Sequence, residues 1–147
     1  MQTKKVIEVY NLLNDFQLSK FTDKDVRKGL ILTYLNFGNV VKQHTENVEK
    51  LRKKFAEDNQ KELAEVSALE QKLMVTTDEK EIEKINKERN KHSKFYTTLA
   101  NLNSDVEELL NKDVEVEIGS IDREKFIDEV PENLTLAQIA LLSDILE

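Results

Sequence analysis

The sequence predicts a mainly α protein built on a long antiparallel helical hairpin, a coiled-coil-like stalk that carries a small α+β head. The main observation is an almost unbroken apolar stripe at helical spacing from Leu30 to Leu73, with a polar gap after Phe55. Its steps alternate between four and three, the spacing of a coiled-coil seam. A second stripe at helical spacing runs from Ile82 to Leu110. Two such helices joined by a short turn are expected to bury their stripes on each other or on a second copy of the chain.

Composition limits the class of protein. The chain has 147 residues, of which 35% are charged, with one Pro and no Trp, as in a water-exposed, helix-rich single domain. The absence of Cys excludes disulfides, thiolate zinc sites and thiol catalysis. No window suggests a membrane span, and the residues after Met1 lack the apolar core of a signal peptide. We therefore expect no membrane association and no secretion by a signal peptide.

The N-terminal elements follow from periodicity and capping. A first helix is predicted from Lys4 to Phe16, with apolar residues on one face. Residues 17–21 alternate polar and apolar, which favours a short strand. Thr22 is a predicted N-cap, so the long outgoing helix is expected to begin at Asp23.

The hairpin turn is predicted at residues 75–77. Thr76 and Glu79 have the spacing of a capping box for the returning helix, which is expected to span residues 78–111. The outgoing helix is expected to stay continuous up to the turn, although its stripe passes through Asn59 in a polar stretch.

The C-terminal third alternates before it returns to helix. Residues 114–118 alternate Val or Ile with Glu, as in a half-exposed strand, and this strand is predicted to pair with residues 17–21 in a two-stranded sheet. Asp122 is a predicted cap for a short helical turn. A Thr-x-x-Gln capping box at Thr135 predicts a terminal helix over residues 136–146.

These elements predict one domain, residues 1–147, with a head formed by residues 1–44 and 106–147 and a stalk formed by residues 45–105. The outgoing helix is longer than the returning one. Its unpaired apolar face needs cover from the first helix, the strand and the terminal helix, and this face consists of Val26, Leu30, Ile31 and Tyr34.

No catalytic, cofactor-binding or metal-binding residues are predicted. The two histidines, His44 and His92, would lie about a stalk length apart in the hairpin and cannot share a ligand. A turn near Thr76 places His92 opposite Asn59, and we predict that these two side chains form a structural polar layer that fixes the register.

Two pairs of residues are candidates for interaction. Phe95 and Tyr96 point about 100° apart on a helix, so both cannot lie in a narrow two-helix seam. We expect the head or a second copy to cover one of them, and we predict a homo-oligomer. Glu115 and Glu117 would form an acidic edge in the segment 105–147, which has thirteen acids and three bases, a net charge of −10.

The chain resembles small helical-hairpin proteins of unknown function that tailed bacteriophages and prophages encode. The resemblance rests on Phe95-Tyr96-x-x-Leu99, on Val114-Glu-Val-Glu-Ile-Gly-Ser-Ile121 and on Leu134-Thr-x-x-Gln138, with Gln17-Leu-Ser-Lys20 before the long helix. It implies a virion, assembly or host-takeover protein in the host cytoplasm or the virion, and it transfers no functional residue.

The expected function is non-enzymatic protein–protein interaction, as a phage-encoded structural, assembly or accessory component. The partner would be a second copy, a phage protein or a host protein. One alternative is an acidic inhibitor or nucleic-acid mimic that acts on a host or defence protein. The other is a nucleic-acid-binding accessory that uses the bases of the stalk; their interleaving with acids favours a solvated, salt-bridged surface instead.

Overall fold

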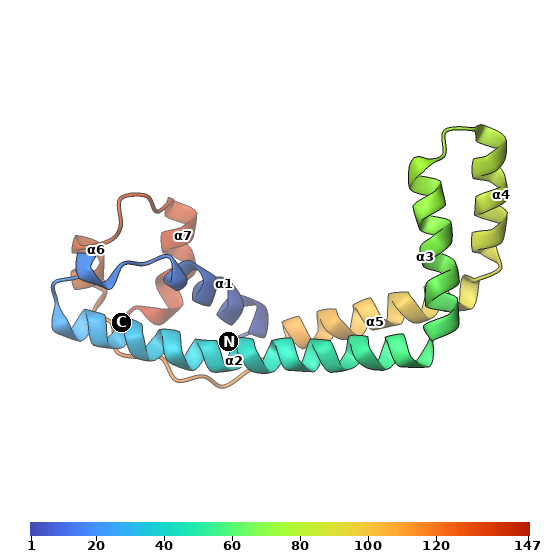
Figure 1. The fold of residues 1–147 in the computed structure, drawn as a ribbon. Coiled ribbons are helices and arrows are strands. Elements are labelled where there is room, and N and C mark those ends of the chain that lie inside the picture. The colour runs from blue at the N-terminus through green and yellow to red at the C-terminus, as the bar shows by residue number, and fades with distance from the viewer. The chain divides into compact units, whose positions relative to one another are not determined.

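The computed structural model describes residues 1–147 and consists of helices joined by loops, the longest of which is the extended segment between α5 and α6 (Figure 1). The prediction of a mainly α protein is confirmed. The α-helices are α1 (Thr3–Asn14), α2 (Lys24–Asp58), α3 (Gln60–Val75), α4 (Glu79–Asn90), α5 (Ser93–Asn111), α6 (Arg123–Asp128) and α7 (Leu136–Leu141), and the 3₁₀ turns are η1 (Leu18–Lys20) and η2 (Leu142–Ile145). No helix combines the length and the apolarity that a membrane span requires.

The chain divides into two compact units. The first unit contains residues 1–45 and 109–147, and the hairpin unit contains residues 46–108. The head and stalk expected from the sequence were divided at 44/45 and 105/106. Both ends of the chain belong to the first unit (Figure 1).

The predicted two-stranded sheet is wrong, because the structure contains no sheet. Residues 18–20 form the η1 turn, in which the Phe21 N–H donates to the Leu18 carbonyl at 3.0 Å. Residues 114–118 are in no regular element. The nearest approach to strand pairing is an isolated bridge between Gln2 and Asp113, where the Val114 N–H donates to the Met1 carbonyl at 2.9 Å.

Side chains of α2 replace the expected partner strand. The Gly119 N–H donates to the Thr33 hydroxyl at 2.9 Å, and the Asn36 amide donates to the Glu117 carbonyl at 3.1 Å. Val114 and Val116 are half-buried against the core, which accounts for their alternation with glutamates. The segment therefore has the alternating side chains of a strand but forms no strand hydrogen bonds. Its buried backbone groups need hydrogen-bond partners, and side chains of a helix can supply them as well as a second strand can.

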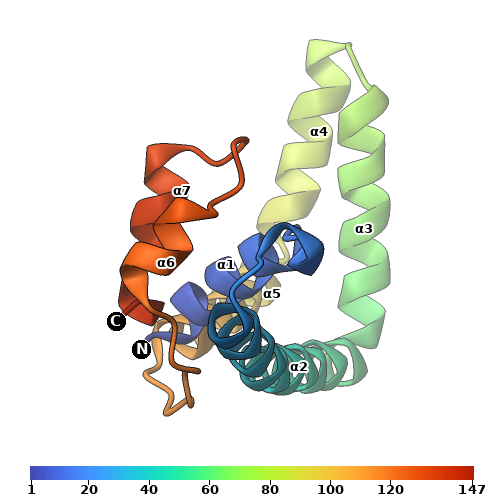
Figure 2. The same ribbon diagram turned by 90° about the vertical axis from the view of Figure 1, so that its left-hand side faces the viewer.

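The core of the first unit combines α1 and the start of α2 with the C-terminal elements. Three phenylalanine rings stack in it: Phe21 lies 5.9 Å from Phe16 and 5.7 Å from Phe126, centroid to centroid. Its buried members are Val6, Val9, Leu12, Leu13, Phe21, Val26, Leu30, Phe37, Ile121, Phe126, Leu142, Ile145 and Leu146. Figure 2 shows α6 and α7 beside α1 in this unit.

The cap of α2 is Asp23, one residue later than expected. The Asp23 carboxylate accepts from the N–H groups of Asp25 and Val26, each at 3.0 Å. Thr22 instead donates its backbone N–H to Glu129 at 2.8 Å, and its hydroxyl donates to the same carboxylate. The residue predicted as a helix cap thus ties the end of α6 to the start of α2.

Both long helices of the predicted hairpin are interrupted. Asn59, with φ −125° and ψ 26°, separates α2 from α3, and its side-chain amide donates to the Phe55 carbonyl at 2.9 Å. On the returning side, the N–H groups of Lys91 and His92 bond three residues back, as in a 3₁₀ turn, which separates α4 from α5. Within the hairpin unit, α3 and α4 therefore run side by side at an angle to α5 (Figure 1).

Of the three helix caps predicted at Thr76, Asp122 and Thr135, the last two are confirmed. Asp122 caps α6 through the Lys125 N–H, and Thr135 and Gln138 form the expected capping box of α7, which continues into η2. The capping box predicted at Thr76 is wrong. Asp78 caps α4 through the Lys80 N–H, and the Thr76 hydroxyl donates back to the Lys72 carbonyl at 2.6 Å.

Candidate interaction pocket

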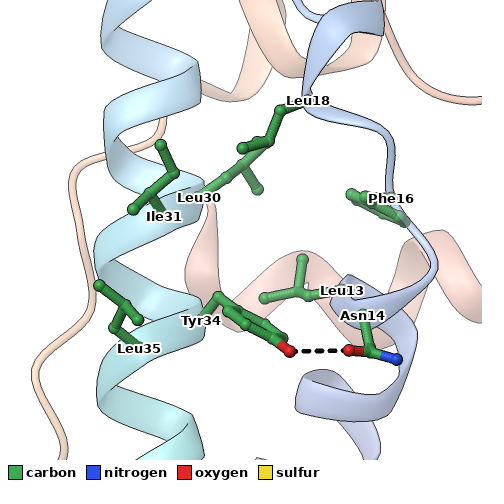
Figure 3. A pocket seen from close by; sticks show the side chains of 8 residues that line it. All are labelled: Leu13, Asn14, Phe16, Leu18, Leu30, Ile31, Tyr34 and Leu35. Carbon is green, nitrogen blue, oxygen red and sulfur yellow. Dashed lines mark hydrogen bonds between the residues drawn. The ribbon is translucent and has the colours of Figure 1, made fainter.

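An open apolar pocket lies in the first unit, between α2 and the connector that follows α1 (Figure 3). It has a volume of about 390 Å³. We call it the apolar pocket. The residues that line it are Leu13, Asn14, Phe16, Leu18, Leu30, Ile31, Tyr34 and Leu35. Six of these eight side chains are Leu, Ile or Phe.

The pocket has a buried floor and an exposed rim. Leu13 and Leu30 are buried core residues and form the floor. The rim residues Leu18, Ile31 and Leu35 are 41%, 41% and 57% exposed, and the neighbouring Leu32 is 44% exposed. Monomeric proteins rarely expose large apolar side chains in a contiguous group without a use for them. Four of the seven exposed large apolar side chains of the first unit belong to this group; the others are Ile118, Ile127 and Leu136.

Helical spacing explains the α2 wall. Ile31 and Leu35 are four residues apart and thus lie on one face of α2, with Leu32 three residues before Leu35. The buried Val26, Thr33 and Phe37 lie on the side of α2 that faces the core, and Leu30 lies between that side and the exposed wall. The wall is therefore rigid. Its exposed side chains face outward because α2 has apolar residues on more of its circumference than the core covers.

The stacked phenylalanines fix the connector wall. Phe16 lies 5.9 Å from Phe21 and 6.2 Å from Phe126, which holds the connector against the core immediately before η1. The η1 turn then places Leu18 at the rim. Both walls are thus held by core packing, so the pocket is pre-formed.

One end of the pocket is polar. The Tyr34 ring stacks on Tyr10 at 4.7 Å, and its hydroxyl donates to Asn14 Oδ1 at 2.7 Å (Figure 3). The Tyr10 hydroxyl, 3.2 Å away, raises the pKa of Tyr34 above its ordinary value, so Tyr34 remains a neutral donor. Asn14 Oδ1 accepts this bond, and the Asn14 amide nitrogen points away from Tyr34 (Figure 3).

Bases without an ion pair lie on the two segments that form the walls of the pocket. Between residues 26 and 45, α2 contains Arg27, Lys28 and Lys42 and no acid. Arg27 and Lys28 lie one turn before Ile31, and Lys20 follows the rim residue Leu18 by two positions. None of these four bases forms an ion pair. Residues 15–45, which include the connector and the α2 wall, contain three acids and five bases, so this part of the chain has a net charge of +2 in a chain of net charge −7.

The hairpin unit accommodates both of the adjacent aromatic residues singled out in the sequence. Phe95 is buried and packs on Phe55, with 5.5 Å between ring centroids. The Tyr96 hydroxyl donates to Glu70 at 2.6 Å and accepts from Arg89 Nε at 3.3 Å, and Arg89 pairs with Glu70 at 2.8 Å. Tyr96 and the ion pair with Glu70 raise the pKa of Arg89. The interrupted helices thus surround both rings within one chain, so neither ring requires a second copy as cover.

The predicted polar layer has different partners from those expected. The Asn59 side chain bonds back to Phe55 of α2, whereas the His92 ring lies 3.5 Å from Glu62 and 3.8 Å from Glu65. These carboxylates belong to the first turns of α3, beyond the break at Asn59. Both predicted residues mark the interruptions of the hairpin helices.

The predicted acidic edge is exposed. Glu115 and Glu117 lie on the extended segment after α5, and neither forms an ion pair. No cluster of His, Asp and Glu side chains in the structure is arranged to hold a metal ion.

Sequence reasoning identified part of the apolar pocket and missed the rest. Leu30, Ile31 and Tyr34 were identified as a face that needs cover, but Leu18 and Leu35 were not. Leu35 lies four residues after Ile31, and neither residue belongs to the coiled-coil stripe. This spacing could have predicted a second apolar face on the helix. No protein-family model matches the chain, and no curated protein or solved structure matches it either.

Proposed function

We propose that this protein is a non-enzymatic protein–protein interaction component that holds its partner in the apolar pocket. The observation that carries the proposal is the pocket itself, a pre-formed hollow of about 390 Å³ with a buried leucine floor and an exposed rim of Leu18, Ile31 and Leu35. Concave apolar surfaces with a few convergent polar groups are the usual form of a binding site. Here Asn14 and Tyr34 are the polar groups.

A protein partner fits this surface better than a small enzyme substrate does. The lining offers no pair of titratable side chains within hydrogen-bond reach that could act as nucleophile and base; its polar residues are an amide and a neutral phenol. Next to the rim, Leu32 is also exposed, so the apolar surface extends beyond the pocket itself. A protein interface needs a larger area than a pocket alone provides. The resemblance to phage and prophage hairpin proteins supports a role in a phage-encoded assembly.

Peptide display tests this proposal. A random peptide library is selected on the whole chain, and the selected peptides are then measured on Leu35→Glu, which places a charge at the rim. The matched control is Leu136→Glu, because Leu136 is 86% exposed and lies outside the pocket. We expect selected peptides to bind the wild type and the control equally and to lose at least about tenfold in affinity on Leu35→Glu.

Two outcomes would contradict the proposal. In the first, selection enriches no peptide. In the second, the enriched peptides bind Leu35→Glu as tightly as the wild type. Because Leu35 is 57% exposed, both variants should fold, and circular dichroism with thermal unfolding verifies this before binding is measured.

One observation favours a second candidate function, inhibition by an acidic surface. Glu115 and Glu117 are exposed and unpaired on a segment whose backbone is held by Thr33 and Asn36. A fixed row of carboxylates can imitate nucleic-acid phosphates. In a competition assay between duplex DNA and the chain for a basic DNA-binding domain, this function predicts displacement of DNA that is weakened in Glu115→Gln/Glu117→Gln. Equal displacement by the variant, or none by the wild type, would reject it.

A further inference from the structure

We infer that the occupant of the apolar pocket is an acidic amphipathic helix of another protein. The inference rests on the proposed function and adds the chemistry of the partner. It is carried by two features of the pocket: the shape of its helical wall and the sign of the charges around it.

The shape of the wall favours a helix. Ile31 and Leu35 form a ridge along α2, and Leu18 stands across the hollow on the connector. A helix docks on such a surface by placing apolar residues at i, i+3 or i+4, and i+7 into the hollow, the helix-in-groove mode of recognition. The recessed floor of Leu13 and Leu30 gives those side chains depth to enter.

The charges favour acidic flanks on that helix. Lys20, Arg27, Lys28 and Lys42 lie around or beyond the rim without a carboxylate partner, and α2 has no acid between Val26 and Thr45. Complementary charges at the rim of an interface raise the association rate and select the partner. A partner with a basic polar face would place like charges opposite each other.

Two designed peptides test the charge and shape together. Each has about 18 residues, long enough to form a helix, and the same leucine spacing, but one has Glu and the other Lys on its polar face. Binding to the full chain is measured by fluorescence anisotropy. We expect the Glu peptide to bind at least about tenfold tighter than the Lys peptide, with an affinity that falls as salt rises.

Matched charge variants locate the effect. Arg27→Glu/Lys28→Glu should reverse the preference between the peptides, whereas Lys50→Glu/Lys54→Glu, which changes the net charge of the chain equally on exposed positions of the hairpin unit, should not. Equal binding of the two peptides to the wild type, or the same response of both double variants, would overturn the inference.

Other occupants give distinct results. If neither peptide binds while display-selected peptides still depend on Leu35, the acidic-helix inference fails and the proposed function stands. A wild-type dimer in sedimentation equilibrium that Leu35→Glu dissociates would identify a second copy as the occupant. Binding to anionic phosphatidylglycerol vesicles that Leu35→Glu abolishes would identify a lipid surface. Either of the last two results would also overturn the inference.

Discussion

Gly29 of α2 and Gly119 of the extended segment lie backbone to backbone. A Cβ atom on Gly119 would stand 2.8 Å from Gly29 Cα, and one on Gly29 would stand 2.7 Å from Ile121 Cγ1 and nearer still to the Ser120 carbonyl oxygen. Neither glycine has a positive φ, so the requirement for glycine here is steric. This contact fixes the path of the chain after α5 along the helix that forms one wall of the apolar pocket.

Alanine at either glycine should destabilise the first unit. Gly119→Ala and Gly29→Ala are each expected to lower the free energy of unfolding by about 1–3 kcal/mol, the usual cost of overpacking, because backbone atoms would have to move. Gly38→Ala is the matched control. Its Cβ would meet the Tyr10 ring at 3.2 Å, and a ring can shift, while the helix gains about 1 kcal/mol from alanine. Urea titrations measure all three, and a Gly29→Ala variant as stable as the wild type would refute the contact.

Thr33 should be needed for its hydroxyl. The hydroxyl donates to the Gly29 carbonyl at 2.8 Å and accepts from the Gly119 N–H at 2.9 Å, in a fully buried position. Thr33→Val keeps the shape but leaves the Gly119 N–H without an acceptor, and we expect a loss of about 1–3 kcal/mol in the free energy of unfolding. Thr33→Ser retains the hydroxyl and should lose less. A larger loss in the serine variant would assign the role of Thr33 to its methyl group instead.

The hairpin unit should depend more on Phe95 than on Tyr96. Phe95→Ala removes a buried ring and is expected to lower the free energy of unfolding by about 3–5 kcal/mol. Tyr96→Phe keeps the ring and removes one hydroxyl, while the pair of Glu70 and Arg89 stays, so a loss of about 1 kcal/mol is expected. Calorimetry of both variants compares the two values. Similar losses in the two variants would mean that the Tyr96 hydroxyl contributes as much to the stability of the hairpin unit as the buried Phe95 ring does.

Acid should weaken the junction between α6 and the start of α2. Hydrogen bonds from Thr22 lower the pKa of Glu129, and the Val26 N–H, helped by Lys125, lowers the pKa of Asp23. A carboxylate with a lowered pKa in the folded state contributes stability above its unfolded pKa, about 3.9 for Asp and 4.3 for Glu, and this stability is lost as the pH falls through the folded pKa.

Chemical denaturation between pH 7 and pH 3 measures this contribution. Glu129→Gln should be less stable than the wild type at pH 7, and the difference should shrink as the pH falls below about 4. Glu132→Gln, at an exposed position without an ion pair, is the control and should follow the wild type. A difference between Glu129→Gln and the wild type that stays constant down to pH 3 would contradict the account.

Local signals predicted the elements that local interactions determine. The caps at Asp122 and Thr135 could be predicted from short motifs, since each cap is formed by residues three positions apart. The turn near Thr76 was also predicted, although the capping box that suggested it does not form and Asp78 caps α4 instead. The breaks at Asn59 and at Lys91–His92 could not be predicted from the sequence. A polar stretch within a solvent-exposed helix has the same composition as a polar stretch at a bend between two helices. What distinguishes them is tertiary packing in the hairpin unit, such as the contacts of His92 with Glu62 and Glu65.

The false strand has a related cause. Alternation in residues 114–118 reports that one face of an extended segment is covered, and it does not identify the covering element. In this chain α2 provides the cover and Thr33 supplies a backbone partner, so no second strand is needed. The apolar pocket was partly missed for the same reason: the stripe predicts which residues can be buried, but only the packed first unit leaves Ile31 and Leu35 exposed.

Methyl NMR of the whole chain tests most directly whether the apolar pocket is a docking site. The tightest display-selected peptide is titrated into protein labelled at Ile, Leu and Met methyl groups. The account predicts saturable shifts at Leu18, Ile31 and Leu35 and none at Met74 or Leu136, although the last two are each 86% exposed. Shifts that are largest at Met74 or Leu136, or that do not saturate, would contradict it.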